Sequence, residues 1–395
     1  MKYIIERIKI SFLLALSAIL IFSSCNKDPL QIPGPLAITP PAGLALGETI
    51  ASIPTDSLYY KIIVKAGLLA TINNRSTFWT MFVPDNTAVR VFITAITGGA
   101  VPAAAPDAAF AGFIASASFP AANANGLVNY NLCPQTITTA SIPSAFPNFQ
   151  YPCNLNPAPS ISALLRLTTF PSIRNGNWLN NVPLTAVNNS TVNGVIHHLA
   201  AVVTPPSRYL IDRVNSDADL TILKAALSRA DSGVAPSAST SLIGALGNIG
   251  ANLTVFAPSN QAFKNIIALL TGGAINNSQP DAVYIGFLGS NNISTQTVKG
   301  IVVYHIMGTR AFANNFPTTA ASYPTLLNGA IPAHPGVSLK CIFTGLIVSA
   351  ATSKGVVNAT ASNIAINPTP DPGGTSDQHF LNGTLHKIDQ VMLPQ

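Results

Sequence analysis

The chain has 395 residues, of which 48% are hydrophobic and 9% are charged, and its formal net charge is +6. This length allows two or three domains with sizeable cores, while the charged fraction lies far below the roughly 25% of ordinary soluble domains. The Lys and Arg residues are scattered, and no basic run carries interleaved aromatic residues. The sequence therefore lacks the features of a nucleic-acid-binding protein.

The N-terminus has the pattern of an export signal. Lys2, Arg7 and Lys9 form a positive region, and residues 10–22 are an apolar stretch that is short for a membrane span. Phe-Ser-Ser before Cys25 resembles a bacterial lipobox. We predict that residues 1–25 are a lipoprotein signal peptide and that Cys25 carries acyl chains such as palmitate. An ordinary secretory leader is the alternative.

A lipid on Cys25 would anchor the mature protein in the bacterial cell envelope, at the periplasmic or surface face of the outer membrane. Residues 26–48 follow the cysteine and contain Pro29, Pro33, Pro35, Pro40 and Pro41. Such a proline density favours an extended, semi-rigid chain. We therefore predict that this segment is a tether between the membrane and the folded part.

The folded part contains an internal duplication. The sequence TMFVPDNTAV at residues 80–89 and TVFAPSNQAF at residues 254–263 share the pattern T-x-F-x-P-x-N-x-A. Thr, Val and Phe favour a strand, and Pro ends it. Apolar residues then recur with helical spacing, so each copy predicts a strand, a turn and a helix with Asn86 or Asn260 at its N-cap.

The offset of 174 residues between the two motifs holds beyond them. TGGA at residues 97–100 recurs at 271–274, and V-x-Y at residues 128–130 recurs at 302–304. An amphipathic helix is predicted before each strand, around residues 58–67 and 219–227. Both copies then diverge into loops rich in Asn, Thr, Ser and Pro, and each closes with Asn-Gly and an apolar run, which indicates a hairpin.

These motifs resemble the two signatures of the fasciclin domain family. Residues 254–263 differ from the first signature, T-V-F-A-P-T-N-x-A-F, only at Ser259. Residues 193–197 fit the second signature, N-G-x-I-H, and residues 382–386 fit it with Leu385 in place of Ile. A Tyr-His pair of the family is present as Tyr304 and His305, while the first copy has Tyr130 and Asn131. The resemblance implies an α+β fold with two tandem fasciclin-like domains, each a β-sandwich-like wedge with packed helices, over residues 49–205 and 207–395.

Three cysteines remain after Cys25. Cys133 and Cys153 lie close together in a loop-rich region, and export permits disulfides, so they are the candidate disulfide pair. Cys341 lies in an apolar run and is predicted to be a buried free thiol. No C-x-x-C motif occurs, and the Cys and His residues have no metal-ligand spacing, so we predict no metal site.

Few residues are candidates for a functional site. His197, His386 and His305 lie among apolar neighbours and are predicted to be buried. Trp178 lies in an Asn/Gly-rich turn, which predicts an exposed aromatic side chain, and together with Tyr151 it is a candidate ligand contact. No G-x-S-x-G or H-E-x-x-H motif is present, and acidic residues are too few to indicate a catalytic pair.

We therefore predict a protein without catalytic residues or a cofactor. The family resemblance implies non-enzymatic adhesion at the cell surface. Together with the lipobox-like leader, it leads us to predict an adhesion or binding lipoprotein that recognises an extracellular glycan or protein. The alternative is an accessory glycan-capture lipoprotein of an outer-membrane polysaccharide uptake system.

Overall fold

The computed structural model describes residues 42–345, 347–366 and 374–395. The predicted signal peptide, Cys25 and most of the tether lie outside these residues. The chain divides into Met1–Ala42 and Gly43–Gln395, and both copies of the duplicated sequence lie in the second unit. Helix α2 already begins at the buried Leu46, so the segment predicted as a tether is helical at its end.

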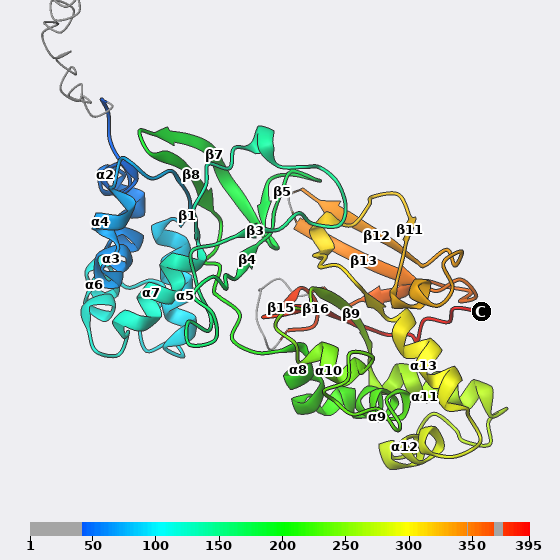
Figure 1. The fold of residues 1–395 in the computed structure, drawn as a ribbon. Helices are drawn as coiled ribbons and strands as arrows, with labels where there is room; N and C mark the ends of the chain where they lie inside the picture. The colour runs from blue at the N-terminus through cyan, green and yellow to red at the C-terminus, as the bar shows by residue number, and fades with distance from the viewer. Residues whose placement is uncertain (1–41, 346, 367–373) are drawn as a thin grey trace, which may run out of the picture. The chain divides into compact units, whose positions relative to one another are not determined.

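The first copy is drawn in blue to green in Figure 1. Its helices are α2 (Leu46–Ser52), α3 (Ser57–Ala66), α4 (Leu69–Ile72), α5 (Asn86–Ile96), α6 (Asp107–Ala115) and α7 (Ala121–Tyr130). Its strands are β1 (Trp79–Pro84), β2 (Leu132–Cys133), β3 (Tyr151–Pro152), β4 (Thr168–Thr169), β5 (Pro171–Ser172), β6 (Trp178–Leu179), β7 (Val182–Thr191) and β8 (Gly194–Leu199). The 3-10 turns are η1 (Pro54–Asp56) and η2 (Thr139–Ser141).

The second copy is drawn in green to red. Its helices are α8 (Leu210–Ser216), α9 (Thr221–Ala230), α10 (Leu242–Leu246), α11 (Asn260–Leu270), α12 (Asp281–Gly289) and α13 (Thr295–Tyr304). Its strands are β9 (Leu253–Pro258), β10 (Ile306–Met307), β11 (Ala321–Tyr323), β12 (Val337–Thr344), β13 (Ile347–Lys354), β14 (Ser362–Ile364), β15 (Gln378–Phe380) and β16 (Gly383–Ile388). The 3-10 turns are η3 (Ala218–Leu220), η4 (Ala313–Asn315) and η5 (Leu326–Gly329).

A parallel pair of strands lies inside each sheet. The first sheet has the order β2-β1-β8-β7-β6-β5, and β1 runs parallel to β8. The second has the order β10-β9-β16-β14-β13-β12-β11, with β15 also paired to β16, and β9 runs parallel to β16. Both parallel pairs join the predicted strand of the first signature to that of the second. The predicted tandem α+β fold is confirmed.

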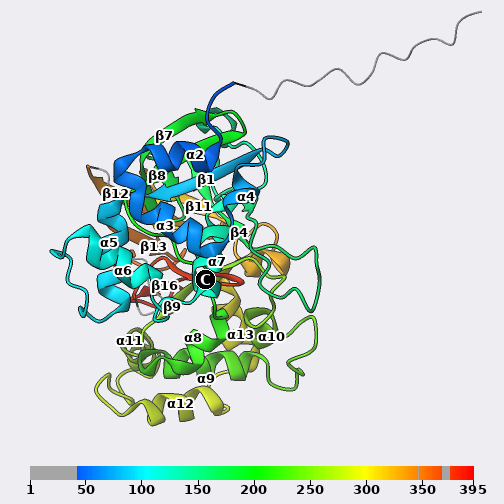
Figure 2. The same cartoon turned by 90° about the vertical axis from the view of Figure 1, so that its left-hand side faces the viewer.

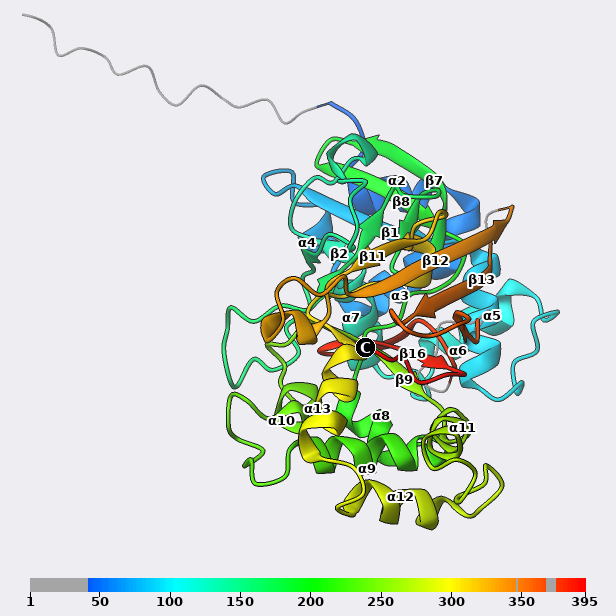
Figure 3. The ribbon, with the colours of Figure 1, turned by 90° about the vertical axis from the view of Figure 1, so that its right-hand side faces the viewer.

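Each parallel pair is buried on both faces. Val255 points into a cluster formed with the helices, whereas its neighbour Phe256 points into a second cluster on the opposite face, against β12 and β13. Met81 and Phe82 divide in the same way in the first copy. Figures 2 and 3 show the helices of each copy gathered on one side of its parallel strands. Successive side chains of a strand point to opposite faces, so alternate residues of each parallel pair enter different cores.

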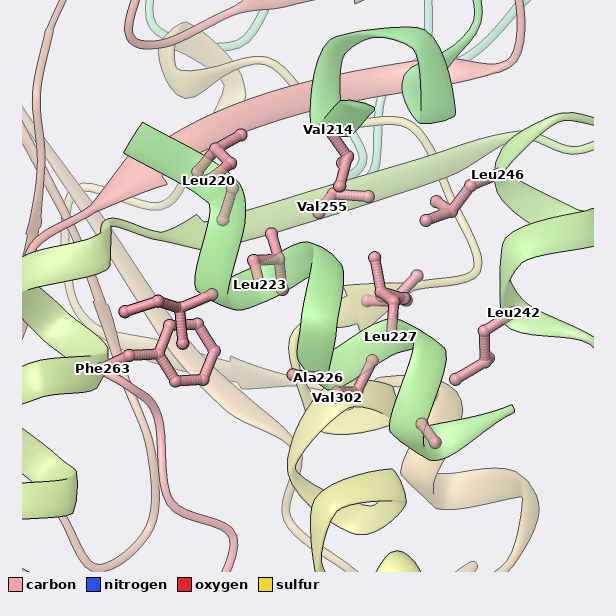
Figure 4. Close-up of a cluster of buried hydrophobic side chains, with 14 of the residues drawn as sticks. Val214, Leu220, Leu223, Ala226, Leu227, Leu242, Leu246, Val255, Phe263 and Val302 are labelled. Atoms are coloured by element: carbon pink, nitrogen blue, oxygen red, sulfur yellow. The ribbon is translucent and has the colours of Figure 1, made fainter. Parts of the chain in front are cut away.

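Helix α9 lies at the centre of the helix-side core of the second copy. Figure 4 shows its side chains meeting residues from α8, α10, β9, α11 and α13. The buried residues of α9 are Ile222, Leu223, Ala226, Leu227 and Ala230, which is the spacing of an amphipathic helix. Burial of a Leu side chain contributes about 1.5–3 kcal/mol, so this face of α9 is a main source of the stability of the second copy.

The helices that start within the first signature begin one residue earlier than predicted, so the prediction that Asn86 and Asn260 are N-caps is wrong. The N-caps are Asp85, which accepts from the amide of Ala88, and Ser259. The Asn side chains reach the preceding helix instead. Asn260 Oδ1 accepts from the amide of Ile222 at 3.1 Å, and Asn86 makes the equivalent bond in the first copy.

The Asn-Gly pairs form the two predicted hairpins. Thr191 pairs with Gly194 across the β7–β8 turn, and Phe380 pairs with Gly383 across the β15–β16 turn. The close approach of the neighbouring parallel strand explains why glycine is needed at both positions. A Cβ at Gly194 would lie 1.9 Å from the carbonyl oxygen of Trp79 in β1. A Cβ at Gly383 would lie 2.4 Å from the carbonyl oxygen of Leu253.

The Asn of each pair joins the first helix of its copy to the last strand. Asn382 Oδ1 accepts from the amide of Leu210, where α8 begins, at 3.0 Å. Its Nδ2 donates to the carbonyl of Leu246, where α10 ends, at 2.8 Å. Asn193 makes the same kind of contacts with Leu46 and Ile72. One fully buried side chain thus satisfies two helix ends.

We expect Asn382→Ala to lower the free energy of unfolding by about 2–4 kcal/mol, because each lost hydrogen bond costs about 1 kcal/mol and each buried group left unpaired adds a further penalty. The measurement is the urea midpoint, compared with that of Asn292→Ala at an exposed loop position. Equal midpoints for the two variants would contradict this role of Asn382.

Candidate functional site

The residues of the first signature are hydrogen-bonded within the scaffold. Thr254 Oγ1 donates to the carbonyl of Thr309 at 2.6 Å and accepts from the amide of Ala311 at 2.9 Å. The same two bonds in the first copy join Thr80 to Gln135 and Ile137. The 174-residue correspondence between the copies therefore extends past Tyr130 and Tyr304. The threonine holds the segment after β10 or β2 against the parallel pair.

The histidines of the second signature occupy equivalent buried positions. His386 Nε2 donates to the carbonyl of Ala311 at 3.1 Å, and its Nδ1 accepts from the amide of Asp377 at 3.2 Å. Its ring stacks on Phe256 with a centroid distance of 5.7 Å. His197 stacks on Phe82 in the same way. Burial lowers the pKa of both histidines, so both are neutral core residues at pH 7.

His305 is buried and links α13 to the C-terminal segment. Its Nδ1 donates to the carbonyl of Ile301 at 2.8 Å, and its Nε2 accepts from the amide of Met392 at 2.9 Å. Asn131, the equivalent residue in the first copy, donates to the carbonyls of Leu127 and Val203. Both residues therefore join the end of the helix to the segment after the last strand.

Trp178 is not exposed, and the prediction that it lies on the surface is wrong. The side chain is 3% exposed and packs against Phe343 of β12, with a centroid distance of 6.1 Å. Its indole nitrogen donates to the carbonyl of Asn175. The Asn/Gly turn that suggested a surface position instead faces the second copy. Trp178 is therefore part of the contact between the copies.

Tyr151 is half-buried. Its hydroxyl donates to the carbonyl of Ser141 at 3.1 Å, and its ring meets the edge of Phe149 at a centroid distance of 5.1 Å. Phe149 is 51% exposed. The two rings form a small aromatic surface, and ligand contact at Tyr151 stays a prediction.

The three described cysteines are buried, free thiols. Cys133 Sγ lies 3.4 Å from the hydroxyl of Thr169, and burial raises the pKa of Cys133 and Cys153 to about 12. These two cysteines belong to one buried cluster, but the candidate disulfide between them is not formed in the structure. Its formation in the exported protein stays a prediction. Burial likewise raises the pKa of Cys341 to about 11, as expected for an unreactive thiol.

A polar network joins the two copies. Arg310 Nη1 donates to His379 Nε2 at 2.7 Å, which requires an unprotonated Nε2 because arginine only donates. His379 Nδ1 lies 3.3 Å from the hydroxyl of Tyr130 in the first copy, and Asn180 Nδ2 donates to the same hydroxyl at 3.2 Å. Burial, followed by the charge of Arg310, holds the pKa of His379 well below its ordinary value.

Asparagines extend this junction along the divergent loops. Asn175 Nδ2 donates to the carbonyls of Asn314 and Phe316, both at 3.0 Å. Asn314 in turn donates to the carbonyl of Asn180 at 3.1 Å, and Asn148 accepts from the amide of Phe312. The loops in which the two copies differ are therefore used in part to hold the copies together.

Sequence reasoning missed the residues of this junction. By the offsets of 174 and 189 residues that relate the copies, Arg310 corresponds to Thr136, and His379 corresponds to Ser190. Both side chains are thus specific to the second copy. A lone arginine within an apolar segment of a charge-poor chain is a signal that could have identified Arg310.

Within residues 42–345, 347–366 and 374–395, no group of three or more His, Cys, Asp or Glu side chains is placed to hold a metal ion. In the same part of the chain, no helix combines the length and the apolar character needed to cross a membrane.

Comparison with known proteins finds a family match within the second copy. Residues 233–394 match the family model of the Fasciclin domain, and no curated protein matches the chain. Among solved structures, the chain is similar to a FAS1 domain pair from the insect cell adhesion molecule Fasciclin I. The identity is 13% and the TM-score is 0.33, over 86% of this chain and 97% of that chain.

The burial of His305 predicts a pH dependence of stability. Burial lowers the pKa of His305 to about 4, below the value of about 6.5 in an unfolded chain. The folded protein thus favours the neutral ring, and this stabilisation is present above pH 6.5 and is lost as the pH falls towards 4. Between pH 6.5 and pH 4 this proton linkage changes the free energy of unfolding by about 1.4 kcal/mol per pH unit. We expect His305→Asn to remove that contribution from the pH dependence.

The measurement is urea unfolding at intervals between pH 7 and pH 5. The control is His334→Asn, which changes a histidine that is half-buried in the loop before β12. The same slope in the wild type and in His305→Asn would show that His305 does not carry this proton linkage.

Proposed function

This chain is a fasciclin-domain protein, and on that basis we propose that it is a non-enzymatic adhesion or binding protein of the bacterial cell envelope. Domains of this family are generally associated with cell adhesion or binding and are generally non-enzymatic. The observation that carries the proposal is that the signature residues serve the scaffold and not a reaction site. Thr254, Asn260, Asn382 and His386 are all buried and hydrogen-bonded within the scaffold.

A protein ligand is favoured over a glycan. The tryptophan that the sequence offered for ligand contact, Trp178, is 3% exposed, and Trp79 is 7% exposed, so neither ring is available for stacking on a sugar. Large apolar side chains are exposed instead on the loop of residues 157–165, where Ile161 is 79% and Leu164 is 88% exposed. Exposed apolar residues of this size favour contact with another protein. A role as a glycan-capture accessory remains the alternative.

The loop of residues 157–165 is ordered by its own hydrogen bonds. The amide of Ile161 donates to the carbonyl of Ala158, and the amide of Leu165 donates to the carbonyl of Ser162. Arg166 Nη1 donates to the carbonyls of Ala163 and Leu165, both at 2.8 Å. A loop that is already ordered loses less conformational entropy on binding. These contacts support the loop as a recognition surface.

We expect the double variant Ile161→Ser, Leu164→Ser to weaken binding of the purified chain to isolated cell envelopes by about tenfold or more, because apolar anchors dominate interface energies. Leu269→Ser is the matched control, since Leu269 is 74% exposed on α11. Protease treatment of the envelopes should abolish binding, and periodate oxidation should not. Loss of binding after periodate alone would favour the glycan alternative.

The cellular location is proposed from the sequence, with a lipid on Cys25 as the anchor. Labelled fatty acid should be incorporated into the wild type and not into Cys25→Ala. The amount of the Cys25→Ala protein in the membrane fraction should also fall. Equal labelling of both proteins would contradict this anchor.

A further inference from the structure

Arg310 is a buried cation without an anionic partner. Its side chain is 3% exposed, and its guanidinium lies 4.8 Å from the ring centroid of Phe170. Its hydrogen-bond partners are the neutral His379 ring and the carbonyl of Leu381, and its Nε donates to no group among the described residues. None of the ion pairs between described residues includes Arg310.

Such an arrangement is costly without a compensating charge. A buried ion loses several kcal/mol of solvation, which neutral hydrogen bonds recover only in part. Burial lowers the pKa of Arg310 to about 10, so the side chain remains charged at neutral pH. The equivalent residue of the first copy is Thr136, which shows that the scaffold does not require a cation here.

Arg310 lies on the wall of a cavity of about 180 Å³ between the two copies. The first copy contributes Gln150, Arg166 and Thr168 to the wall, and the second contributes Asn252. No Asp or Glu is among the described residues that line the cavity, so both of its charges are positive. The volume admits several water molecules or a small organic molecule.

The remaining wall residues carry no charge. They are largely apolar and comprise Pro157, Leu165, Leu167, Ile249, Ala251 and Leu381, together with Gly250. Most of the surface that faces the cavity is nevertheless polar, and a monocarboxylate carries the single negative charge that one buried guanidinium balances. Arginine also binds carboxylates through two parallel hydrogen bonds.

We propose that this cavity is a binding site for a small organic acid, whose carboxylate is the missing partner of Arg310. Gln150 and the Thr168 hydroxyl supply further donors, and the exposed Arg166 adds a second positive charge to the wall. Because the wall comes from both copies, a bound acid would also strengthen the contact between them. Pro157 and Leu165 of the wall belong to the loop of residues 157–165, but the test below uses small acids alone, so its outcome does not depend on the protein ligand proposed for that loop.

The test is isothermal titration of the full chain with acetate, with butyrate and with inorganic phosphate, in a buffer free of other organic acids. We expect saturable binding of one acetate or one butyrate per chain. Arg310→Gln should abolish the binding, with the fold checked by circular dichroism. The absence of saturable binding of either acid to the wild type would overturn the proposal.

A second variant covers the case in which Arg310→Gln fails to fold. Thr168→Val keeps the size of the side chain and a residue suited to β4, and it should raise the Kd for butyrate about tenfold, because a hydrogen bond to a charged group is lost. Thr352→Val, in β13 and outside the cavity, is the matched control. Equal Kd values for the two threonine variants, or saturable binding of phosphate but not of butyrate, would overturn the carboxylate assignment.

Discussion

The burial of a parallel strand pair on both of its faces is the constraint on which the rest of this structure depends. β9 and β16, like β1 and β8, separate a helix-side core from a second core. A polar side chain on such a strand has no access to water and must find its partners inside the protein. Thr254 and His386 do so by binding the segment around Ala311, which closes the second core.

The same requirement explains why the most distinctive sequence motifs are not a working surface. Asn260 and Asn382 satisfy amides at the starts of helices that lie far away in the sequence. The motif residues therefore fix helices to strands, and substitutions that preserve hydrophobicity but remove these donors and acceptors would leave buried groups unpaired. Features available for recognition lie where the copies differ: the loop with Ile161 and Leu164, and the junction with Arg310 and His379.

The junction shows how a chain with few charges holds two similar units together. Amide side chains such as Asn175 and Asn314 bind backbone carbonyls across the contact, and Trp178 packs against Phe343. Neutral hydrogen bonds of this kind depend little on salt, in contrast to surface ion pairs. Arg310 departs from this neutral pattern, and that departure marks the cavity beside it as a site with its own chemistry.

The sequence alone determined the duplication and the burial of His197, His305 and His386, because paired motifs and apolar neighbours report local structure directly. The tandem α+β fold followed from the resemblance of those motifs to the fasciclin signatures. It misplaced the N-caps at Asn86 and Asn260 by one residue, since Asp85 and Ser259 are equally good caps. Only the tertiary structure decided the burial of Trp178 and the meeting of Arg310 with Tyr130 and His379. These facts depend on contacts between segments that are distant in sequence, and no local pattern encodes which loop of one copy faces which loop of the other.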